Sequence, residues 1–383
     1  MITQTVYIYI LLINNLFTMT DMNTYNKAQP TDASQLKRLV LRELPSTLEY
    51  FDCSMFSLTV LPDLPAGLKT LICSGNQLTE LPTLPDGLET LICHRNNLKS
   101  LPELPDSLLT LNCSYNKFDR ELSQNNGKFP PNLKVLICDG NKKLRCLPEL
   151  PEGIEQLQVF DCDLSDLPTL PNSLTVVNCG YNPLGYLPDL PDSLTELSCQ
   201  ATRIQTLPTL PPGLAILKCH DNRLDELPEL PKSLDELLCQ QNELVELPIL
   251  PDSLTMLDCS RNRLTRLPLL PKNIIRLICK DNCLYSLPEI RERMVFDISR
   301  NPIAYILKNK YGGYAGIRER SATWNRFRRL YYSLRLKTKF RDYLWKNVRS
   351  RKIAEKYHPD NLVQLLAGTT DDEMFDDEIL ENW

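Results

Sequence analysis

The chain has 383 residues, of which 42% are hydrophobic, and this composition excludes an intrinsically disordered protein. Its 29 prolines and 13 glycines fit neither a collagen nor a chain of flexible glycine linkers. The net charge of -5 is unevenly spread: residues 308–358 hold 16 basic and 3 acidic groups, and residues 359–383 hold 8 acidic groups and no Lys or Arg. The chain therefore divides into a long acidic part, a short basic part and an acidic end.

Residues 2–17 are apolar and uncharged, and three interpretations stay open for them. A signal peptide needs a basic start and a small-residue cleavage site, which are not evident. A membrane anchor needs about 20 apolar residues, and Asn14 and Asn15 interrupt this stretch. The third is an extension or leader upstream of the folded part. We predict a leader without fixed structure over residues 1–30 and an N-terminal helical cap over 31–43, where apolar residues follow a polar start at helical spacing.

A repeat of 20 residues fills the chain from 44 to 303. Residues 81–100 show one unit, LPTLPDGLETLICHRNNLKS. Thirteen copies, which we call coils, can be aligned on one position of this unit. That position holds Cys53, Cys73, Cys93, Cys113, Cys138, Val159, Cys179, Cys199, Cys219, Cys239, Cys259, Cys279 and Ile298.

The residues around the cysteine position alternate as in a strand with one buried face. The residue two places before it is always apolar, whereas the residue between them varies, as Ile72, Asn112 and Lys218 do. Each coil therefore supplies one short strand. Parallel stacking at about 4.8 Å predicts a sheet on the order of 60 Å long.

Most coils contain paired prolines, such as Pro82 and Pro85, and these determine the backbone conformation on the side opposite the strand. Proline removes a backbone donor and disfavours helix in the residue before it, so we expect an extended, polyproline II-like convex side without helices. One coil is five residues too long, with the excess in residues 118–132, and we expect that insertion to bulge from the solenoid after the fourth strand.

An asparagine follows the cysteine position by three residues in ten coils, at a point where the chain turns inward. We expect its amide to satisfy buried backbone groups. Three coils depart from the pattern, with Phe56, Cys162 and Thr202. Cys162 and Thr202 keep some hydrogen-bonding capacity, whereas Phe56 does not, so we expect the first coil to be distorted or capped.

This pattern resembles the leucine-rich repeat, L-x-x-L-x-L-x-x-N/C-x-L, in the short, proline-paired form of bacterial effectors. The resemblance implies an α/β-type leucine-rich repeat solenoid with a parallel β-sheet on its concave face. Some effectors of this kind end in a ubiquitin-ligase domain with a catalytic cysteine. No cysteine follows Cys283, and the remaining chain is too short for that domain, so this enzymatic function is not carried over.

Residues 304–368 are predicted to form a basic α-helical C-terminal region, and residues 369–383 an acidic tail. Trp324, Phe327 and Tyr331 begin an apolar stripe at helical spacing, which indicates amphipathic helices with basic outer faces. The first interpretation is a cap over the last coils. The alternative is a surface that binds nucleic acid or an anionic membrane, with the solenoid as a spacer.

His358, Pro359 and Asp360 form the tripeptide of J-domain co-chaperones, but no first J helix precedes them and the residues that follow are few and acidic. The KYHPDNL stretch, the basic Leu- and Trp-rich segment and the acidic end are instead similar to uncharacterised repeat proteins of giant viruses of amoebae. This resemblance implies a viral origin and no particular activity.

The fourteen cysteines follow the period of the repeat, which a disulfide framework has no reason to keep. We predict buried, reduced thiols, and hence a reducing location in the host cell cytoplasm or the virion rather than secretion. The three histidines lie far apart in the chain, and one thiol per coil does not make a tetrahedral zinc site. We therefore predict no metal, no cofactor and no catalytic residues.

The sequence favours a non-catalytic protein-protein interaction scaffold, a monomer directed at host or viral proteins. A solenoid presents a rigid concave sheet with variable outward side chains. The candidate partner-binding residues on that face are Ile72, Ile92, His94, Ile137 and Phe160. A run of exposed apolar side chains indicates a partner, although β-branched residues also favour strands for their own sake.

Overall fold

The computed structural model describes residues 44–119, 122, 128–288 and 294–307, together with seven single positions between 323 and 337. The predicted leader, the helical cap at 31–43, the acidic tail and nearly all of the basic region lie outside the described residues.

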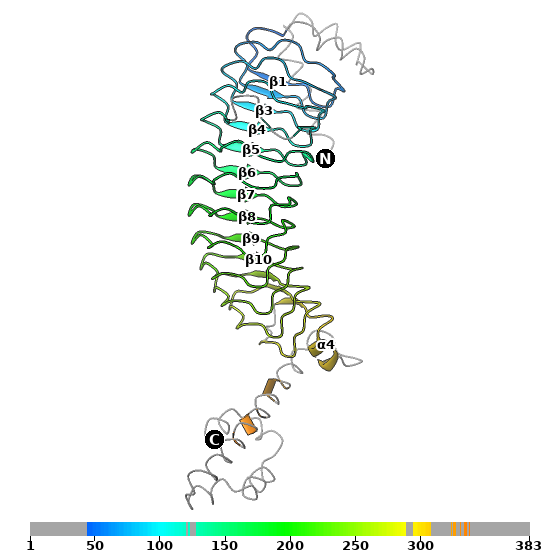
Figure 1. The fold of residues 1–383 in the computed structure, drawn as a ribbon, viewed down its shortest axis with the longest axis vertical. Coiled ribbons are helices and arrows are strands. Elements are labelled where there is room, and N and C mark those ends of the chain that lie inside the picture. The colour runs from blue at the N-terminus through cyan, green and yellow to red at the C-terminus, as the bar shows by residue number, and fades with distance from the viewer. Residues whose placement is uncertain are drawn as a thin grey trace, which may run out of the picture. The chain divides into compact units, whose positions relative to one another are not determined.

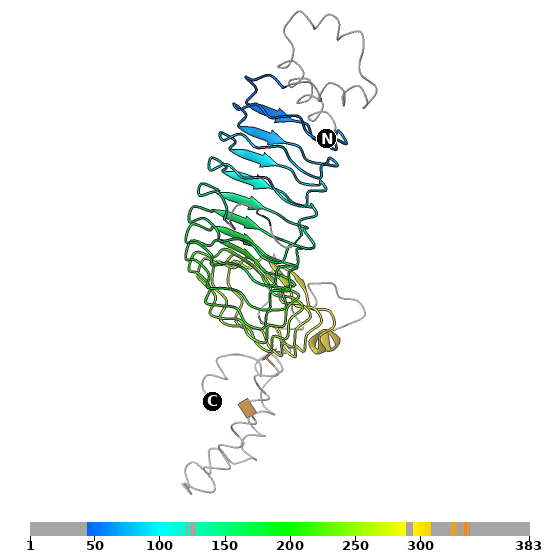
Figure 2. The ribbon, with the colours of Figure 1, turned by 45° about the horizontal axis from the view of Figure 1, so that its top comes forward.

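Thirteen strands of three residues each form one parallel sheet in chain order, β1 to β13, stacked coil on coil (Figures 1 and 2). The predicted solenoid with one strand per coil is confirmed. The strands are β1 Tyr50–Asp52, β2 Thr70–Ile72, β3 Thr90–Ile92, β4 Thr110–Asn112, β5 Val135–Ile137, β6 Gln156–Gln158, β7 Val176–Asn178, β8 Glu196–Ser198, β9 Ile216–Lys218, β10 Glu236–Leu238, β11 Met256–Asp258, β12 Arg276–Ile278 and β13 Val295–Asp297.

The middle residue of every strand points into the solenoid and is buried, as the alternation predicts. Neighbouring strands pair in register, so that Leu71 lies opposite Phe51 on one side and Leu91 on the other. The residue two places later is buried as well. We call the eleven cysteines at this position the ladder, and all of them are fully inaccessible to solvent. The core is therefore a set of continuous apolar columns that run from coil to coil.

No helix occurs between β1 and β13 among the described residues, which confirms the prediction from the paired prolines. We call the side of the coils opposite the strands the return side. It contains tight turns, and in one of them the Leu88 amide donates to the Pro85 carbonyl at 3.0 Å. Hydroxyl groups join successive turns: Ser107 Oγ donates to the carbonyls of Asp86 and Leu88 at 2.7 and 2.6 Å.

The long coil between β4 and β5 is anchored in the core. Phe118 and Phe129 replace the leucines of the other coils, and both are buried. Within the insertion Leu122 is also buried, at 1% exposure. The bulge expected from residues 118–132 is thus fixed by apolar contacts at its two ends and at Leu122, the part that the structure describes.

The asparagine column performs the predicted role. Asn76 Nδ2 donates to the carbonyls of Cys53 and Cys73 at 2.8 and 2.9 Å, and its Oδ1 accepts from the amides of Phe56 and Leu58. The first coil therefore keeps its β-pairing and its bonds to the next coil despite Phe56. The distortion expected there is seen at Ser57, whose φ is 55°.

A short helix, α4, spans Pro302–Leu307 and follows the last strand. It belongs to a second compact unit of the chain, and the amide of Ile303 there donates to the carbonyl of Leu284 at 2.9 Å. In the same unit Asn325 Nδ2 donates to the Leu287 carbonyl at 2.6 Å. Apart from residues 304–307 and the seven single positions between 323 and 337, the helical region predicted from residue 304 onward lies outside the described residues.

Candidate functional site

The five candidate residues all lie on the outward side of the sheet. Ile72, Ile92 and Ile137 end strands β2, β3 and β5, while His94 and Phe160 follow strand ends by two residues. The alternation predicts that these residues are exposed, whereas all five are half-buried in the structure. We attribute this to the close spacing of in-register parallel strands, about 4.8 Å, which brings outward side chains of neighbouring coils together. Ile72 and Ile92 lie directly opposite each other, and Asn112 separates Ile92 from Ile137.

The outward residues of six consecutive strands, β2 to β7, carry no charge. We call this set the uncharged strand surface. It consists of Thr70, Ile72, Thr90, Ile92, Thr110, Asn112, Val135, Ile137, Gln156, Gln158, Val176 and Asn178. At about 4.8 Å per coil, it extends about 24 Å along the sheet.

Each of the remaining strands, β1 and β8 to β13, has one charged residue among its two outward positions. These residues are Asp52, Glu196, Lys218, Glu236, Asp258, Arg276 and Asp297. Glu196 and Lys218 form an ion pair at 3.0 Å across β8 and β9. The sheet is thus divided into a stretch of six strands without outward charges and flanking strands that each carry one outward charge.

An aromatic cluster, which we define as Arg95, Tyr115, Phe160 and Tyr181, borders the uncharged strand surface at the ends of its strands. The Phe160 and Tyr181 rings lie 4.9 Å apart, and the Arg95 guanidinium carbon lies 5.8 Å from the centre of the Tyr115 ring. Tyr115 and Tyr181 remain about half exposed, at 50% and 48%.

Backbone conformation places these side chains on the outer edge. In every coil the residue three places after the strand has a positive φ, between 53° and 70°, and Arg95, Tyr115 and Tyr181 occupy this position. Gly140 occupies it in the coil after Tyr115, and a Cβ atom there would lie 2.5 Å from Tyr115 Cδ1. The Tyr115 ring can therefore lie this close to the next coil only because that coil has a glycine.

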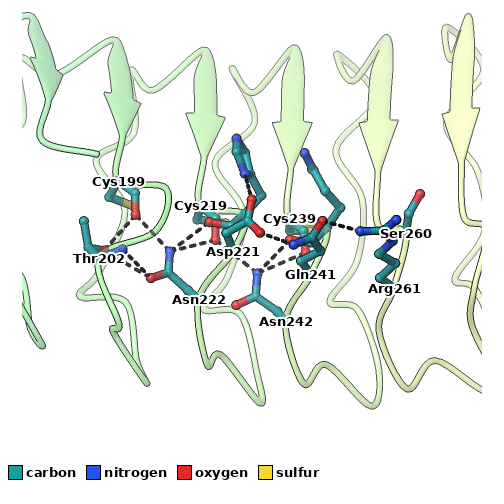
Figure 3. A network of polar contacts seen from close by, with 12 residues as sticks. Cys199, Thr202, Cys219, Asp221, Asn222, Cys239, Gln241, Asn242, Ser260 and Arg261 are labelled. Carbon is teal, nitrogen blue, oxygen red and sulfur yellow. Dashed lines mark hydrogen bonds and ion pairs between the residues drawn. The ribbon is translucent and has the colours of Figure 1, made fainter. Parts of the chain in front are cut away.

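The corresponding edge of the later coils is polar. We call His220, Asp221, Gln241, Arg261 and Asp281 the polar row. Figure 3 shows Asp221, Gln241 and Arg261 of this row. His220 Nδ1 lies 2.6 Å from Asp221 Oδ2, and Gln241 Nε2 donates to Asp221 Oδ1. Arg261 Nη1 donates to Gln241 Oε1 at 2.8 Å and its Nε lies 4.0 Å from Asp281. These groups largely satisfy one another, so this edge offers fewer open contacts than the aromatic cluster.

Burial shifts the pKa of two groups near the uncharged strand surface, in the direction expected for each when its charged form is desolvated. The pKa of His94 is lowered by burial and by the adjacent Arg95. The pKa of Asp139 is raised by burial, against a hydrogen bond of 2.8 Å from the Phe160 amide and together with the nearby Asp161.

The part of the chain that the structure describes contains no group of three or more His, Cys, Asp or Glu residues that could hold a metal ion. The pKa of every ladder thiol is raised, by a hydrogen bond with Cys162 and by burial at Cys138 and mainly by burial at the others, so none of them resembles a cysteine nucleophile. None of the helices within those residues is long and apolar enough to cross a membrane.

Sequence reasoning missed Arg95, Tyr115 and Tyr181. Their common position in the repeat was visible, but its outward direction depends on the positive φ, which the repeat pattern did not reveal. The uncharged strand surface could have been found by comparing outward columns across all thirteen coils.

The described coils form a parallel solenoid of the leucine-rich repeat class. No family model matches the chain, and no curated protein matches it in sequence. Among solved structures, YopM from Yersinia enterocolitica is 34% identical, with a TM-score of 0.63, over 73% of this chain and 67% of that one. YopM from Yersinia pestis, described as a leucine-rich effector protein, is 31% identical, with a TM-score of 0.57, over 73% of this chain and 92% of that one. This chain belongs to the leucine-rich repeat family.

Proposed function

We propose that this protein is a non-catalytic scaffold that binds a protein partner through the uncharged strand surface and the aromatic cluster. The observation that carries the proposal is the absence of charge from the outward positions of β2 to β7, beside strands that each carry a charge. Charged residues are depleted at the centres of protein interfaces, whereas Tyr, Phe and Arg are enriched there. The two similar effector solenoids support an interaction scaffold in general terms.

The aromatic cluster gives this surface its strongest anchors. Tyr115 and Tyr181 combine exposed apolar area with a polar tip, and their packing against Gly140 and Phe160 restricts them before binding. A side chain that is already ordered loses less entropy when a partner binds. The surface is therefore suited to a partner with an apolar, uncharged patch.

Photo-crosslinking from two matched positions tests the proposal. Ile92 and Leu238 both end a strand, point outward and are half-buried, but only Ile92 belongs to the uncharged strand surface. We expect a crosslinker at position 92 to trap a discrete partner in expressing cells, and one at position 238 to trap none. Ile92→Arg should then weaken binding of that partner at least about tenfold, whereas Leu238→Arg should not. Trapping at position 238 alone, or equal effects of both substitutions, would contradict the proposal.

The viral origin, the host or viral identity of the partner and the reducing location belong to this proposal as well. The C-terminal resemblance is the basis for the viral origin and the partner's identity, and the cysteine pattern is the basis for the reducing location. The similar solved structures support the repeat fold and do not bear on these points. Oxidation of the ladder in protein isolated from its native source would argue against a reducing location.

A second candidate function depends on the 16 basic groups of residues 308–358, which would bind nucleic acid or an anionic membrane. Binding of this kind weakens steeply as salt rises, whereas contacts through the uncharged strand surface should be nearly insensitive to salt. Salt dependence of complex formation by the full chain therefore separates the two functions.

A further inference from the structure

Two apolar side chains stand exposed on the return side of the solenoid, away from the proposed binding surface. Ile249 and Leu269 are 89% and 90% exposed, the largest exposures among the big hydrophobic side chains that the structure describes. Both occupy the variable position between the paired prolines. In the other coils that position holds Asp63, Thr83, Glu103, Lys128, Glu149, Thr169, Asp189, Thr209, Glu229 and Glu289.

Ile249 and Leu269 lie in consecutive coils whose turns have the same geometry. The Leu254 amide donates to Pro251 at 3.1 Å, and the Ile274 amide donates to Pro271 at 3.3 Å. Asn273 Nδ2 donates to the Asp252 carbonyl at 3.1 Å and joins the two turns directly. The two exposed side chains are therefore neighbours at about the coil spacing and form one apolar patch.

Two opposite charges accompany the patch at equivalent places in the two coils. Asp252 follows Pro251 in one turn and Lys272 follows Pro271 in the next, and both are exposed. Neither forms an ion pair with another residue in the described ranges. Each coil thus presents one apolar group and one charge, and the charges of the two coils are opposite.

We propose that this patch binds a second copy of the chain. Consider a twofold axis that passes between these two turns, perpendicular to the solenoid axis and along the surface. It would place Ile249 of each copy against Leu269 of the other. The same rotation places Asp252 of each copy opposite Lys272 of its neighbour. The surface is therefore self-complementary in both apolar contact and charge, with the solenoids antiparallel and their uncharged strand surfaces free.

The contact centres on two apolar side chains and two charges per copy, so it is smaller than a permanent interface. We expect a weak dimer that forms at high concentration, in place of the monomer expected from the sequence. The inference does not depend on the proposed function, because it uses a different face and different residues.

Sedimentation velocity of the full chain from about 1 µM to 1 mM, the range of weak complexes, tests the proposal. Leu269→Glu should raise the dissociation constant at least about tenfold, and it should fold because other coils hold Glu at this position. Thr169→Glu, at the same position of an earlier coil outside the patch, is the matched control and should change nothing.

A charge exchange distinguishes a second copy from any other occupant. Asp252→Lys and Lys272→Asp should each weaken association, because each creates two like-charged pairs across the axis. The double variant should restore it, because the pairs are then reversed. Failure of the double variant to restore association, an effect of Thr169→Glu equal to that of Leu269→Glu, or a monomer at all concentrations would overturn the proposal.

Discussion

Asn222 shows how a single side chain holds two coils together (Figure 3). Its Nδ2 donates to the carbonyls of Cys199 and Cys219 at 2.9 and 3.0 Å. Its Oδ1 accepts from the amides of Thr202 and Ile204 at 2.9 and 3.2 Å. The strand ends and the turn of the preceding coil would otherwise leave these backbone groups buried without partners, which explains the recurrence of Asn at this point.

We expect Asn222→Ala to lower the free energy of unfolding by at least about 3 kcal/mol, because several buried donors and acceptors lose their partner at once. Asn222→Thr should cost about half as much, since Thr202 at the equivalent position donates its hydroxyl to Cys199 at 2.8 Å. Urea unfolding of the three proteins measures both values. Equal losses for the two variants would show that the amide acts by shape rather than by hydrogen bonding.

At the scale of one strand, inward and outward residues have different roles. Leu237 is fully buried between Leu217 and Leu257, whereas its neighbour Leu238 points outward and is half-buried. The two leucines are adjacent and chemically identical, so they form a natural pair for separating core packing from surface contact.

Leu237→Ala should destabilise the protein by about 2–5 kcal/mol, because it leaves a cavity in a column that cannot collapse between two rigid coils. Leu238→Ala should cost less than about 1.5 kcal/mol, since it removes only partly buried surface. Thermal or urea unfolding measures both losses. A larger loss at Leu238 than at Leu237 would mean that this strand faces the opposite way.

The strand count, the direction of each strand residue and the role of Asn76 could be predicted from the sequence, because the strand pattern recurs in thirteen coils and the asparagine in ten of them. The anchoring of the insertion by Leu122 could not, because a non-repeating segment has no column to compare with. The aromatic cluster depends on a left-handed turn, and Tyr115 needs the glycine one coil away. Such relations between coils are the part that single-repeat reasoning does not capture.

At the scale of the whole solenoid, the ladder of eleven cysteines forms one buried column, interrupted by Val159 within it and followed by Ile298 at its end. In the described chain all fourteen cysteines are free thiols, and Cys283 is the exposed one. Burial raises the pKa of Cys179 and Cys219 to about 12, and burial together with neighbouring thiols raises that of Cys199 well above its usual value. The folded column therefore holds its protons at a pH where an unfolded chain releases them.

This difference predicts a loss of stability in alkali. A raised folded-state pKa stabilises the protein fully below the unfolded thiol pKa of about 8.5, and the stabilisation is lost as the pH rises toward the folded value of about 12. Urea unfolding under reducing conditions from pH 7 to about pH 10.5 should show this decline. The matched variant is the double substitution Cys179→Val, Cys219→Val, because Val159 occupies the same position in its own coil. Its free energy of unfolding should decline less steeply with rising pH, because valine does not titrate. Identical slopes for the two proteins would mean that Tyr or Lys residues, rather than the ladder thiols, cause the loss.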